Sequence, residues 1–287
     1  MNDSSCEDES TNQNPGINLA FVQLALLART KVLVADLKLT PEAESVVNAS
    51  RGNAAFATCD VTQWADLERL PSEVIKAFGS GAIADIWIAG AGVFEPKWSS
   101  FLYDTEDDHY KAMQINAEHP IKLTRIAMRS SLGANKPCVV LITASSAGLV
   151  GTYGAALYCA SKHAVVGFTK SMRQADVDEN VKVVCVCPGI VATPLWTAEA
   201  AKNVAAQFSY TDDIALTADE VAQAMRELIE DGKYAGGAVL RMSKGNLREV
   251  VDVEQVTAVD MARKAWIEGT YKPVREHFGK ERGAKKP

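Results

Sequence analysis

The chain has 287 residues, of which 47% are hydrophobic and 23% are charged, with 19 glycines and 10 prolines. These values are typical of a globular protein and exclude a disordered or fibrous chain. Thirty Lys and Arg against 36 Asp and Glu give a formal net charge of −6, so a dominant basic surface for nucleic acid is not expected. One α/β domain of about 250 residues would leave a few tens of residues for terminal extensions.

The cysteines and the N-terminus indicate a cellular location. The chain has six cysteines, which are Cys6, Cys59, Cys138, Cys159, Cys185 and Cys187. Most of them lie within apolar runs, which favours buried free thiols in a reducing compartment. None is placed at the ligand spacing of a zinc site, so no metal is expected. The start, MNDSSCEDES, lacks the apolar core of a signal peptide, and no apolar run approaches the ~18 residues of a membrane span. We therefore expect a soluble, cytoplasmic protein.

From residue 17 onward, short apolar runs alternate with longer amphipathic stretches. The apolar runs predict strands at Lys31–Asp36, Ala54–Thr58, Ile83–Ala89, Cys138–Thr143, Val181–Cys187 and Gly237–Met242. The amphipathic stretches predict helices at Leu19–Ala28, Gln63–Phe78, Asp107–Ser131, Ala155–Asp176 and Asp219–Asp231. Nearly uninterrupted apolar strands that alternate with helices predict an α/β fold, in which a parallel sheet is covered by helices on both faces. Ligands of such sheets bind beyond the carboxyl ends of the strands.

Three predicted strands are followed by residues that suit a ligand site. Asp36 closes the first strand, where a carboxylate accepts hydrogen bonds from the ribose of a dinucleotide. Asp60 follows the second strand and either belongs to such a site or caps the next helix, which opens at Thr62 or Gln63. Ala89-Gly90-Ala91-Gly92 follows the third strand, where its small residues form either a surface for a flat ligand or a tight turn.

The strongest chemical pattern consists of Ser145, Tyr158 and Lys162, with Asn116 upstream. Tyr158 and Lys162 are four residues apart, so they share one face of the predicted helix. An ammonium beside a phenol favours the phenolate and lowers the pKa of the phenol from ~10, which suits an acid or base near neutrality. Ser145 lies at the end of a strand, where its hydroxyl is placed to hydrogen-bond a substrate oxygen.

Around these residues the chain resembles the short-chain dehydrogenase/reductase family in its one-domain Rossmann form, from about Thr11 to Met242. The matching residues are Tyr158-x-x-x-Lys162 within YCASKHAVVGFTKS, Ser145 thirteen residues earlier, Asn116 in MQINAEHP, and Pro188–Pro194, PGIVATP. The segments around Tyr158 and in PGIVATPLW are most similar to the branch that contains 15-hydroxyprostaglandin dehydrogenase and its fungal relatives. The resemblance implies a single Rossmann-type doubly wound parallel sheet, whose first strand is degenerate in this chain.

The resemblance also implies a reaction, which is hydride transfer between a nicotinamide and a secondary alcohol or ketone. Tyr158 would exchange the hydroxyl proton, and Ser145 would orient the substrate oxygen. Lys162 would lower the pKa of Tyr158 and hold the nicotinamide ribose. Asn116 would position Lys162 through a water molecule.

The implied cofactor is NAD, with NADP left open because Lys38 is nearby. Asp36 is followed by Leu37 and not by Arg, which favours the free ribose 2′-hydroxyl of NAD. The residues that would bind the cofactor are Gly16, Ile17, Asp36, Asp60, Val61, Ala91, Gly92, Tyr158, Lys162, Ile190, Val191 and Thr193.

The N-terminus departs from the family, which opens with an apolar strand and Thr-Gly-x-x-x-Gly-x-Gly. The matching segment here is Thr11-Asn12-Gln13-Asn14-Pro15-Gly16-Ile17-Asn18, which retains only Gly16 of the three glycines. Residues 3–10 contain four acids, whereas a central parallel strand is continuously apolar. Burying unpaired carboxylates costs several kcal/mol each, so we expect residues 3–10 to lie outside the sheet or to be disordered. The sheet would then have a gap or a frayed middle.

Two explanations for this start stay open. Either an incorrectly joined first exon has replaced the natural start, which we favour, or the lineage has given up tight dinucleotide binding. A second departure lies at Ala89-Gly90, where the family commonly has Asn-Asn. This change removes side-chain hydrogen-bonding groups from a central strand, while Ala91-Gly92 still leaves room for the adenosine ribose.

The resemblance to the family ends at Met242, which suggests that the chain has three regions. These are an atypical acidic segment at 1–10, a Rossmann domain at 11–250, and a C-terminal helix with a basic tail at 251–287. Val256–Trp266 predicts a short amphipathic helix over the substrate mouth or a neighbouring subunit. Residues 270–287 hold six bases and two acids, which favours a solvated tail, with a substrate lid or a contact to an anionic surface as alternatives.

The leading functional hypothesis is an NAD(P)-dependent oxidoreductase that interconverts a secondary alcohol and a ketone, with secondary metabolism as the suggested setting. Its substrate would be small to medium and apolar, in a pocket lined by Pro194, Leu195, Trp196 and residues 94–98. A homodimer or homotetramer is expected, through the helices that carry Asn116 and Tyr158. The alternatives are a redox-neutral isomerase or cyclase on the same fold, and a non-catalytic scaffold.

Overall fold

The computed structural model describes residues 16–94, 101–102, 104, 107–197, 202–245, 247–251 and 261–283. Its strands are β1 (Val32–Asp36), β2 (Ala54–Thr58), β3 (Ile86–Ala89), β4 (Cys138–Thr143), β5 (Val181–Pro188), β6 (Val239–Ser243) and β7 (Leu247–Val250). Its α-helices are α1 (Ile17–Leu27), α2 (Pro41–Ala49), α3 (Trp64–Phe78), α4 (Lys111–Met113), α5 (His119–Gly133), α6 (Ala156–Ser171), α7 (Arg173–Glu179), α8 (Pro194–Thr197), α9 (Lys202–Gln207), α10 (Ala218–Glu230) and α11 (Met261–Glu281). One turn of π-helix, Gln114–Glu118, joins α4 to α5. No helix in the described ranges is long and apolar enough to cross a membrane.

The strands form two hydrogen-bonded groups. β1 pairs with β2, and β3, β4, β5, β6 and β7 follow one another in the second group. All pairs are parallel except β6 with β7, which confirms the predicted parallel α/β arrangement. β1 and β3 are not paired with each other but border a common groove. The sheet therefore has the gap that the sequence predicted, while residues 3–10 themselves lie outside the described ranges.

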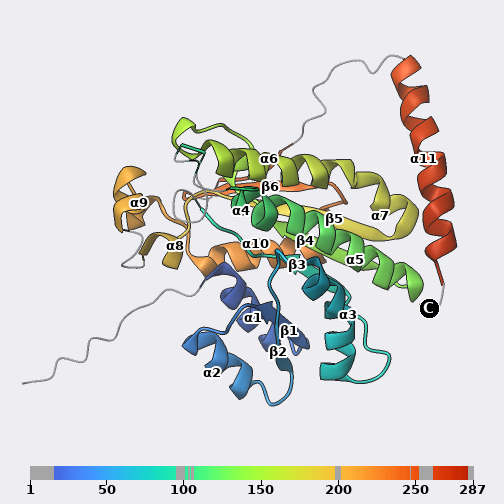
Figure 1. Cartoon of the computed structure of the whole chain (residues 1–287), viewed down its shortest axis with the longest axis horizontal. Helices are drawn as coiled ribbons and strands as arrows, with labels where there is room; N and C mark the ends of the chain where they lie inside the picture. The colour runs from blue at the N-terminus through green and yellow to red at the C-terminus, as the bar shows by residue number, and fades with distance from the viewer. Residues whose placement is uncertain are drawn as a thin grey trace, which may run out of the picture.

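Helices cover both faces of the strands (Figure 1). On one face, α3, α5 and α6 pack against alternate strand residues such as Val140 and Cys185. On the other face, α10 and α1 pack against the intervening residues, such as Leu141 and Val184. Because both faces are buried, the central strands are apolar at nearly every position. Polar side chains that serve function are consequently placed beyond the strand ends.

Most predicted elements are found within a few residues of their expected positions, but α2 was missed. Thr40 caps this helix, because its hydroxyl accepts a hydrogen bond from the Ala43 amide at 3.2 Å, and Pro41 occupies the first turn. The helix buries none of its residues deeply, so it carries little of the apolar periodicity on which the prediction relied.

The C-terminal segment also differs from the prediction. Residues 270–281 belong to α11 and are not a solvated tail, and the helix lies beside α5 and α7 (Figure 1). Three ion pairs join this region to α5 and α7: Arg125–Glu281, Arg275–Asp178 and Arg282–Glu179. Phe278 packs against the core beneath them. Two bases of this region, Arg275 and Arg282, are therefore paired with acids about a hundred residues upstream, which local composition does not reveal. Of the helix expected at Val256–Trp266, residues 256–260 lie outside the described ranges.

The packing of α10 onto the sheet generates a stability prediction. Leu228 of α10 is fully buried against the strands, whereas Leu27 at the end of α1 is 82% exposed. Leu228→Ala should lower the free energy of unfolding by about 2–5 kcal/mol, because a buried side chain is lost and a cavity remains. The matched control Leu27→Ala should change it by about 0.5 kcal/mol or less. Chemical denaturation measures both, and equal losses would contradict this packing.

Candidate active site

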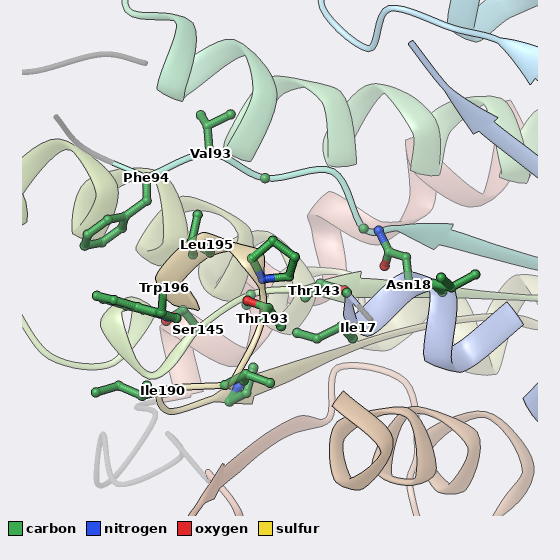
Figure 2. Close-up of a pocket in the computed structure, with 18 of the residues that line it drawn as sticks. Ile17, Asn18, Val93, Phe94, Thr143, Ser145, Ile190, Thr193, Leu195 and Trp196 are labelled. Carbon is green, nitrogen blue, oxygen red and sulfur yellow. The ribbon is translucent and has the colours of Figure 1, made fainter. Parts of the chain in front are cut away.

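A cavity of about 900 Å³ lies beyond the carboxyl ends of β1, β3, β4 and β5, at the edge of the sheet where the sequence placed a ligand. Figure 2 shows Ile17 and Asn18 at one end and Phe94 and Trp196 at the other. Asp36 also lines the cavity, on the side of α1 and α2. The cavity is therefore long enough to connect the start of α1 with the residues around Ser145.

Ser145, Tyr158 and Lys162 meet in this cavity. Tyr158 and Lys162 lie one turn apart on α6, and Ser145 follows β4. The hydroxyls of Ser145 and Tyr158 are hydrogen-bonded to each other. Lys162 Nζ donates to the carbonyl oxygen of Thr143 at 2.8 Å and lies 5.7 Å from the centre of the Tyr158 ring. A proton-exchanging phenol, a second hydroxyl and an ammonium thus share one site.

Burial dominates the titration of this group. It raises the pKa of Tyr158 to about 12, although the hydrogen bond with Ser145 acts in the opposite direction. Burial also lowers the pKa of Lys162 to about 8. The expectation that Lys162 lowers the pKa of Tyr158 is not met in this structure, because the ammonium is directed to the Thr143 carbonyl and desolvation of the phenolate is the larger effect.

Asn116 holds a loop beside the site. The side chain is 1% exposed in the π-helical turn. Its Oδ1 accepts from the Val93 amide and its Nδ2 donates to the Val93 carbonyl, both at 2.9 Å, and Nδ2 also donates to Ser161 Oγ at 3.1 Å. Through Val93 this carboxamide fixes the neighbouring Phe94 over the cavity. A Cβ on Gly92 would lie 3.5 Å from Asn116 Oδ1 and 3.6 Å from Lys162 Nζ, so both polar groups face the same glycine.

The start of α1 forms the opposite end of the cavity. Gly16 precedes the helix with extended backbone and provides no side-chain cap. The first helical hydrogen bond runs from the Ala20 amide to the Gly16 carbonyl, so the amides of residues 17–19 are not bonded within the helix. Such an N-terminus suits the phosphates of a dinucleotide. At the end of β1, Asp36 Oδ1 accepts from the Leu37 amide at 2.7 Å.

Asn18 is packed directly onto the end of β3. A Cβ built on Gly90 would overlap the Asn18 carboxamide, so a larger residue at position 90 would displace this side chain. Figure 2 shows the side chain of Asn18 extended toward the end of β3. Asn18 borders both the cavity and the groove between β1 and β3. Its side chain therefore fills space that stays empty in a family member with glycine at this position.

The segment after β5 is fixed by backbone pairing. Ile190, Val191 and Thr193 all line the cavity. Three hydrogen bonds hold the segment: Gly189 N to Met242 O at 2.8 Å, Leu216 N to Ile190 O at 2.9 Å, and Ala192 N to Leu216 O at 2.8 Å. These backbone hydrogen bonds hold the segment in the wall of the cavity.

Three of the residues predicted to bind a cofactor lie outside this cavity. Asp60 Oδ1 accepts from the amide and the hydroxyl of Thr62, at 2.9 and 2.7 Å, so it serves the turn that enters α3. Val61 and Ala91 line the neighbouring groove between β1 and β3 instead. The remaining residues of that set, Gly16, Ile17, Asp36, Gly92, Tyr158, Lys162, Ile190, Val191 and Thr193, line the cavity.

Aromatic side chains enclose the end of the cavity that holds Tyr158. Phe94 contacts Tyr158 edge-on, with ring centres 4.7 Å apart, and also contacts Trp196 at 5.3 Å and Phe208 at 5.2 Å. Trp196 stacks on Tyr210 at 5.8 Å with nearly parallel rings. Pro194 and Leu195 complete this wall, while residues 95–98 of the predicted pocket lie outside the described ranges.

Sequence reasoning missed Thr143 and Phe208. Thr143 carries the carbonyl that anchors Lys162, and its position as a hydroxyl residue ending a strand was a usable signal. Phe208 carries no such signal, because only the return of the chain after α9 brings it to Phe94. Among the described residues, no group of three or more His, Cys, Asp or Glu is placed to hold a metal ion.

The cavity suits a dinucleotide. It runs from the unbonded amides at the start of α1 to Lys162, and Asp36 lies where a ribose hydroxyl would be bound. At the other end, the buried Thr143 Oγ1 has no hydrogen-bond partner among the described residues. A bound polar group would satisfy such an orphaned hydroxyl.

The buried Lys162 generates a prediction for stability against pH. Its pKa of about 8 lies below the ordinary 10.5, so the unfolded chain binds more protons between about pH 8 and 10.5. The unfolding free energy of the unaltered protein should therefore rise relative to that of Lys162→Met across this window, by roughly 3 kcal/mol at most. Denaturation series from pH 7 to 10 measure the difference. Lys76→Met, at an exposed position on α3, controls for the lost charge, and parallel curves for the protein and Lys162→Met would contradict the buried ammonium.

Comparison with known proteins identifies the family of the chain. Residues 11–204 match the family model described as short chain dehydrogenase. Momilactone A synthase of Oryza sativa subsp. japonica is 29% identical over 238 residues, which cover 80% of this chain and 85% of that protein. The 15-hydroxyprostaglandin dehydrogenase [NAD(+)] of Rattus norvegicus is 28% identical over 254 residues, covering 82% and 90%. A short-chain dehydrogenase/reductase of Stachybotrys chlorohalonatus is 26% identical over 270 residues, covering 88% and 80%.

The family match covers more than half of the chain, and it includes Ser145, Tyr158, Lys162 and Asn116, which the fold gathers at and beside one cavity. The parallel sheet with helices on both faces agrees with the same assignment. The chain therefore belongs to the short-chain dehydrogenase family of oxidoreductases that act on CH–OH groups.

Proposed function

We propose that this protein interconverts a secondary alcohol and a ketone with NAD as the preferred cofactor, on a small to medium apolar substrate. One observation carries the proposal. The hydrogen-bonded Ser145 and Tyr158, with Lys162, lie at one end of a cavity whose other end begins at the free amides of α1 and at Asp36. Gly16, Ile17 and Asp36 would hold the adenosine and phosphate half, and Lys162, Ile190, Val191 and Thr193 the nicotinamide half.

The chain's own residues provide the proton chemistry. A bound nicotinamide supplies or accepts the hydride at the carbinol carbon. In ketone reduction, Tyr158 donates its phenolic proton to the substrate oxygen, and Ser145 holds that oxygen by a hydrogen bond. In alcohol oxidation, the Tyr158 oxygen takes up the hydroxyl proton. Burial raises the pKa of Tyr158 to about 12, so the phenol is protonated at neutral pH, which is the form required for reduction.

Asp36 supports NAD over NADP. Its carboxylate is exposed at the end of β1 and lines the cavity, where its second oxygen, Oδ2, has no partner among the described residues. That oxygen is available to a ribose hydroxyl, whereas a 2′-phosphate would be repelled by the same carboxylate. Lys38 lines the cavity too and offers a compensating charge.

The aromatic wall supports an apolar substrate. Phe94, Trp196 and Phe208 all line the cavity on the side of Tyr158, and they contact one another. Burial of such rings favours substrates with an apolar body, and the hydroxyls of Ser145 and Tyr158 are placed to orient one oxygen.

The assembly, the setting and the division of the chain are further parts of this proposal. We infer a homodimer or homotetramer formed through α5 and α6, a role in secondary metabolism, and a cytoplasmic location, which the buried free thiols of five described cysteines support. The Rossmann domain would span 11–250, preceded by the acidic segment 1–10 and followed by the helix-bearing extension 251–287.

Cofactor titration tests the proposal. NADH and NADPH are titrated against the full chain while nicotinamide fluorescence is followed, and NADH should bind about tenfold or more tightly than NADPH. Asp36→Ala should reduce this preference, because the repulsion of the 2′-phosphate is removed. Glu44→Gln, an exposed carboxylate on α2 outside the cavity lining, should leave it unchanged. Absence of binding at millimolar cofactor would rule out the dehydrogenase and leave the scaffold or redox-neutral hypotheses.

Tyrosine substitution tests the proton donor. Tyr158→Phe should lower kcat by about 10²- to 10⁴-fold and leave NADH affinity nearly unchanged, since only the exchangeable proton is lost. Tyr153→Phe removes the same hydroxyl from a fully exposed ring and serves as the control. Turnover is measured with a panel of apolar ketones. Undiminished turnover of Tyr158→Phe would assign the proton to another group.

A further inference from the structure

The ring of Phe94 joins the proton donor to the rest of the aromatic wall. Phe94 lies on the loop that follows β3 and is only 8% exposed. Its ring meets that of Tyr158 edge-on, with centres 4.7 Å apart and planes at 79°, and it also contacts Trp196 and Phe208. Figure 2 shows Phe94 and Trp196 together at the end of the cavity that holds Ser145. A large apolar group therefore lies directly against the phenol.

The loop that carries Phe94 is fixed by the buried carboxamide of Asn116. Asn116 Oδ1 accepts from the amide of Val93, and Asn116 Nδ2 donates to the carbonyl of the same residue, both at 2.9 Å. Figure 2 shows the side chains of Val93 and Phe94 on different sides of this segment. The backbone pairing of Val93 therefore sets the direction in which the Phe94 ring points.

The same carboxamide also holds the backbone of Tyr158. Asn116 Nδ2 donates to Ser161 Oγ at 3.1 Å, and Ser161 Oγ donates to the Tyr158 carbonyl at 2.7 Å. Both Asn116 and Ser161 are buried. One buried side chain thus ties the loop of Phe94 to the helix of Tyr158, and this tie holds the two rings in contact.

The other groups around the phenol do not offset its burial. Ser145, which follows β4, hydrogen-bonds the hydroxyl and favours the phenolate, whereas Cys159 of α6 and Cys187 of β5 disfavour the phenolate by charge. Lys162 Nζ lies 5.7 Å from the ring centre and donates to a strand carbonyl instead. Burial is the largest effect and raises the pKa of Tyr158 to about 12.

We propose that Phe94 is a positioning residue for the proton donor, because its ring fixes the phenol of Tyr158 beside Ser145 and keeps water away from it. Tyr158 then remains protonated, and able to donate to a substrate oxygen, up to alkaline pH. Phe94 has no proton to exchange and acts only through Tyr158. The inference rests on the proposed function of Tyr158 as the proton donor in ketone reduction, and it gives Phe94 a part in that step besides lining the substrate pocket.

The protonation of Tyr158 is measured directly by NMR. The full chain is isotopically labelled at the Cζ atoms of its tyrosines, and the Tyr158 signal is identified by its loss in Tyr158→Phe. The Cζ chemical shift reports the change from phenol to phenolate and is followed without cofactor from about pH 7 to 11. Because burial holds the pKa of Tyr158 at about 12, the unaltered protein should keep mainly the phenol signal across this range.

Phe94→Ala should lower the midpoint of this titration by about one pH unit or more, because water then reaches the phenol. Phe94→Leu keeps an apolar side chain and should leave the midpoint within about 0.3 of a unit. The matched control Phe208→Ala removes the same kind of ring from the same wall, where its ring contacts are with Phe94 and Trp196. This control should not move the midpoint.

Equal titrations of the unaltered protein and Phe94→Ala would overturn the proposal, as would equal shifts in Phe94→Ala and Phe208→Ala. If Phe94→Ala does not fold, Phe94→Gln takes its place. Glutamine keeps most of the volume but brings a hydrated amide to the phenol, so it should lower the midpoint in the same way.

The same shift should appear in turnover. kcat/KM for the reduction of an apolar ketone by NADH should begin to fall at a pH lower by about one unit in Phe94→Ala, and Phe94→Leu should show no such change. The NMR titration needs neither cofactor nor turnover, so its failure overturns the role of Phe94 alone. Absence of NADH binding overturns the dehydrogenase instead.

Discussion

Burial of the central strands on both faces is the constraint from which the active site follows. β4 and β5 lie between two helical layers, so side chains that must meet solvent or a ligand are displaced to the strand ends. Ser145 follows β4, and Ile190 follows β5 at the same edge. Lys162 reaches this edge from α6 while only 4% exposed, and its hydrogen bond to Thr143 offsets part of the cost of burying an ammonium.

The sequence predicted those parts of the molecule that one local pattern determines. The strands at Ala54–Thr58 and Cys138–Thr143 have the predicted bounds, because each apolar run is flanked by polar or small residues. Tyr158 and Lys162 came together because a spacing of four residues fixes one helical face. By contrast, α2 has a capping signal but no buried stripe, and α11 depends on acids of α7 and a base of α5 that are remote in sequence.

The proximity of Tyr158 and Lys162 does not by itself determine their protonation states. The spacing placed an ammonium near a phenol, which alone favours a lowered phenol pKa. Desolvation acts on the same pair in the opposite sense and depends on how Phe94 and the strand ends enclose them, which is a property of the folded surroundings. The proximity of Ser145, Tyr158 and Lys162 was therefore predictable from the sequence, whereas their protonation states required the structure.

The contact between Asn18 and Gly90 links two departures that looked unrelated along the chain. The family pattern has glycine at the position of Asn18 and asparagine at the position of Gly90, so this chain has exchanged the two residue types across one contact. The carboxamide at the end of β3 is thus supplied from α1, and the glycine that makes room for it directly follows the strand. A Cβ at position 90 would overlap the Asn18 carboxamide in its present conformation. One position therefore limits the other, because a residue larger than glycine at position 90 requires the Asn18 side chain to adopt another conformation.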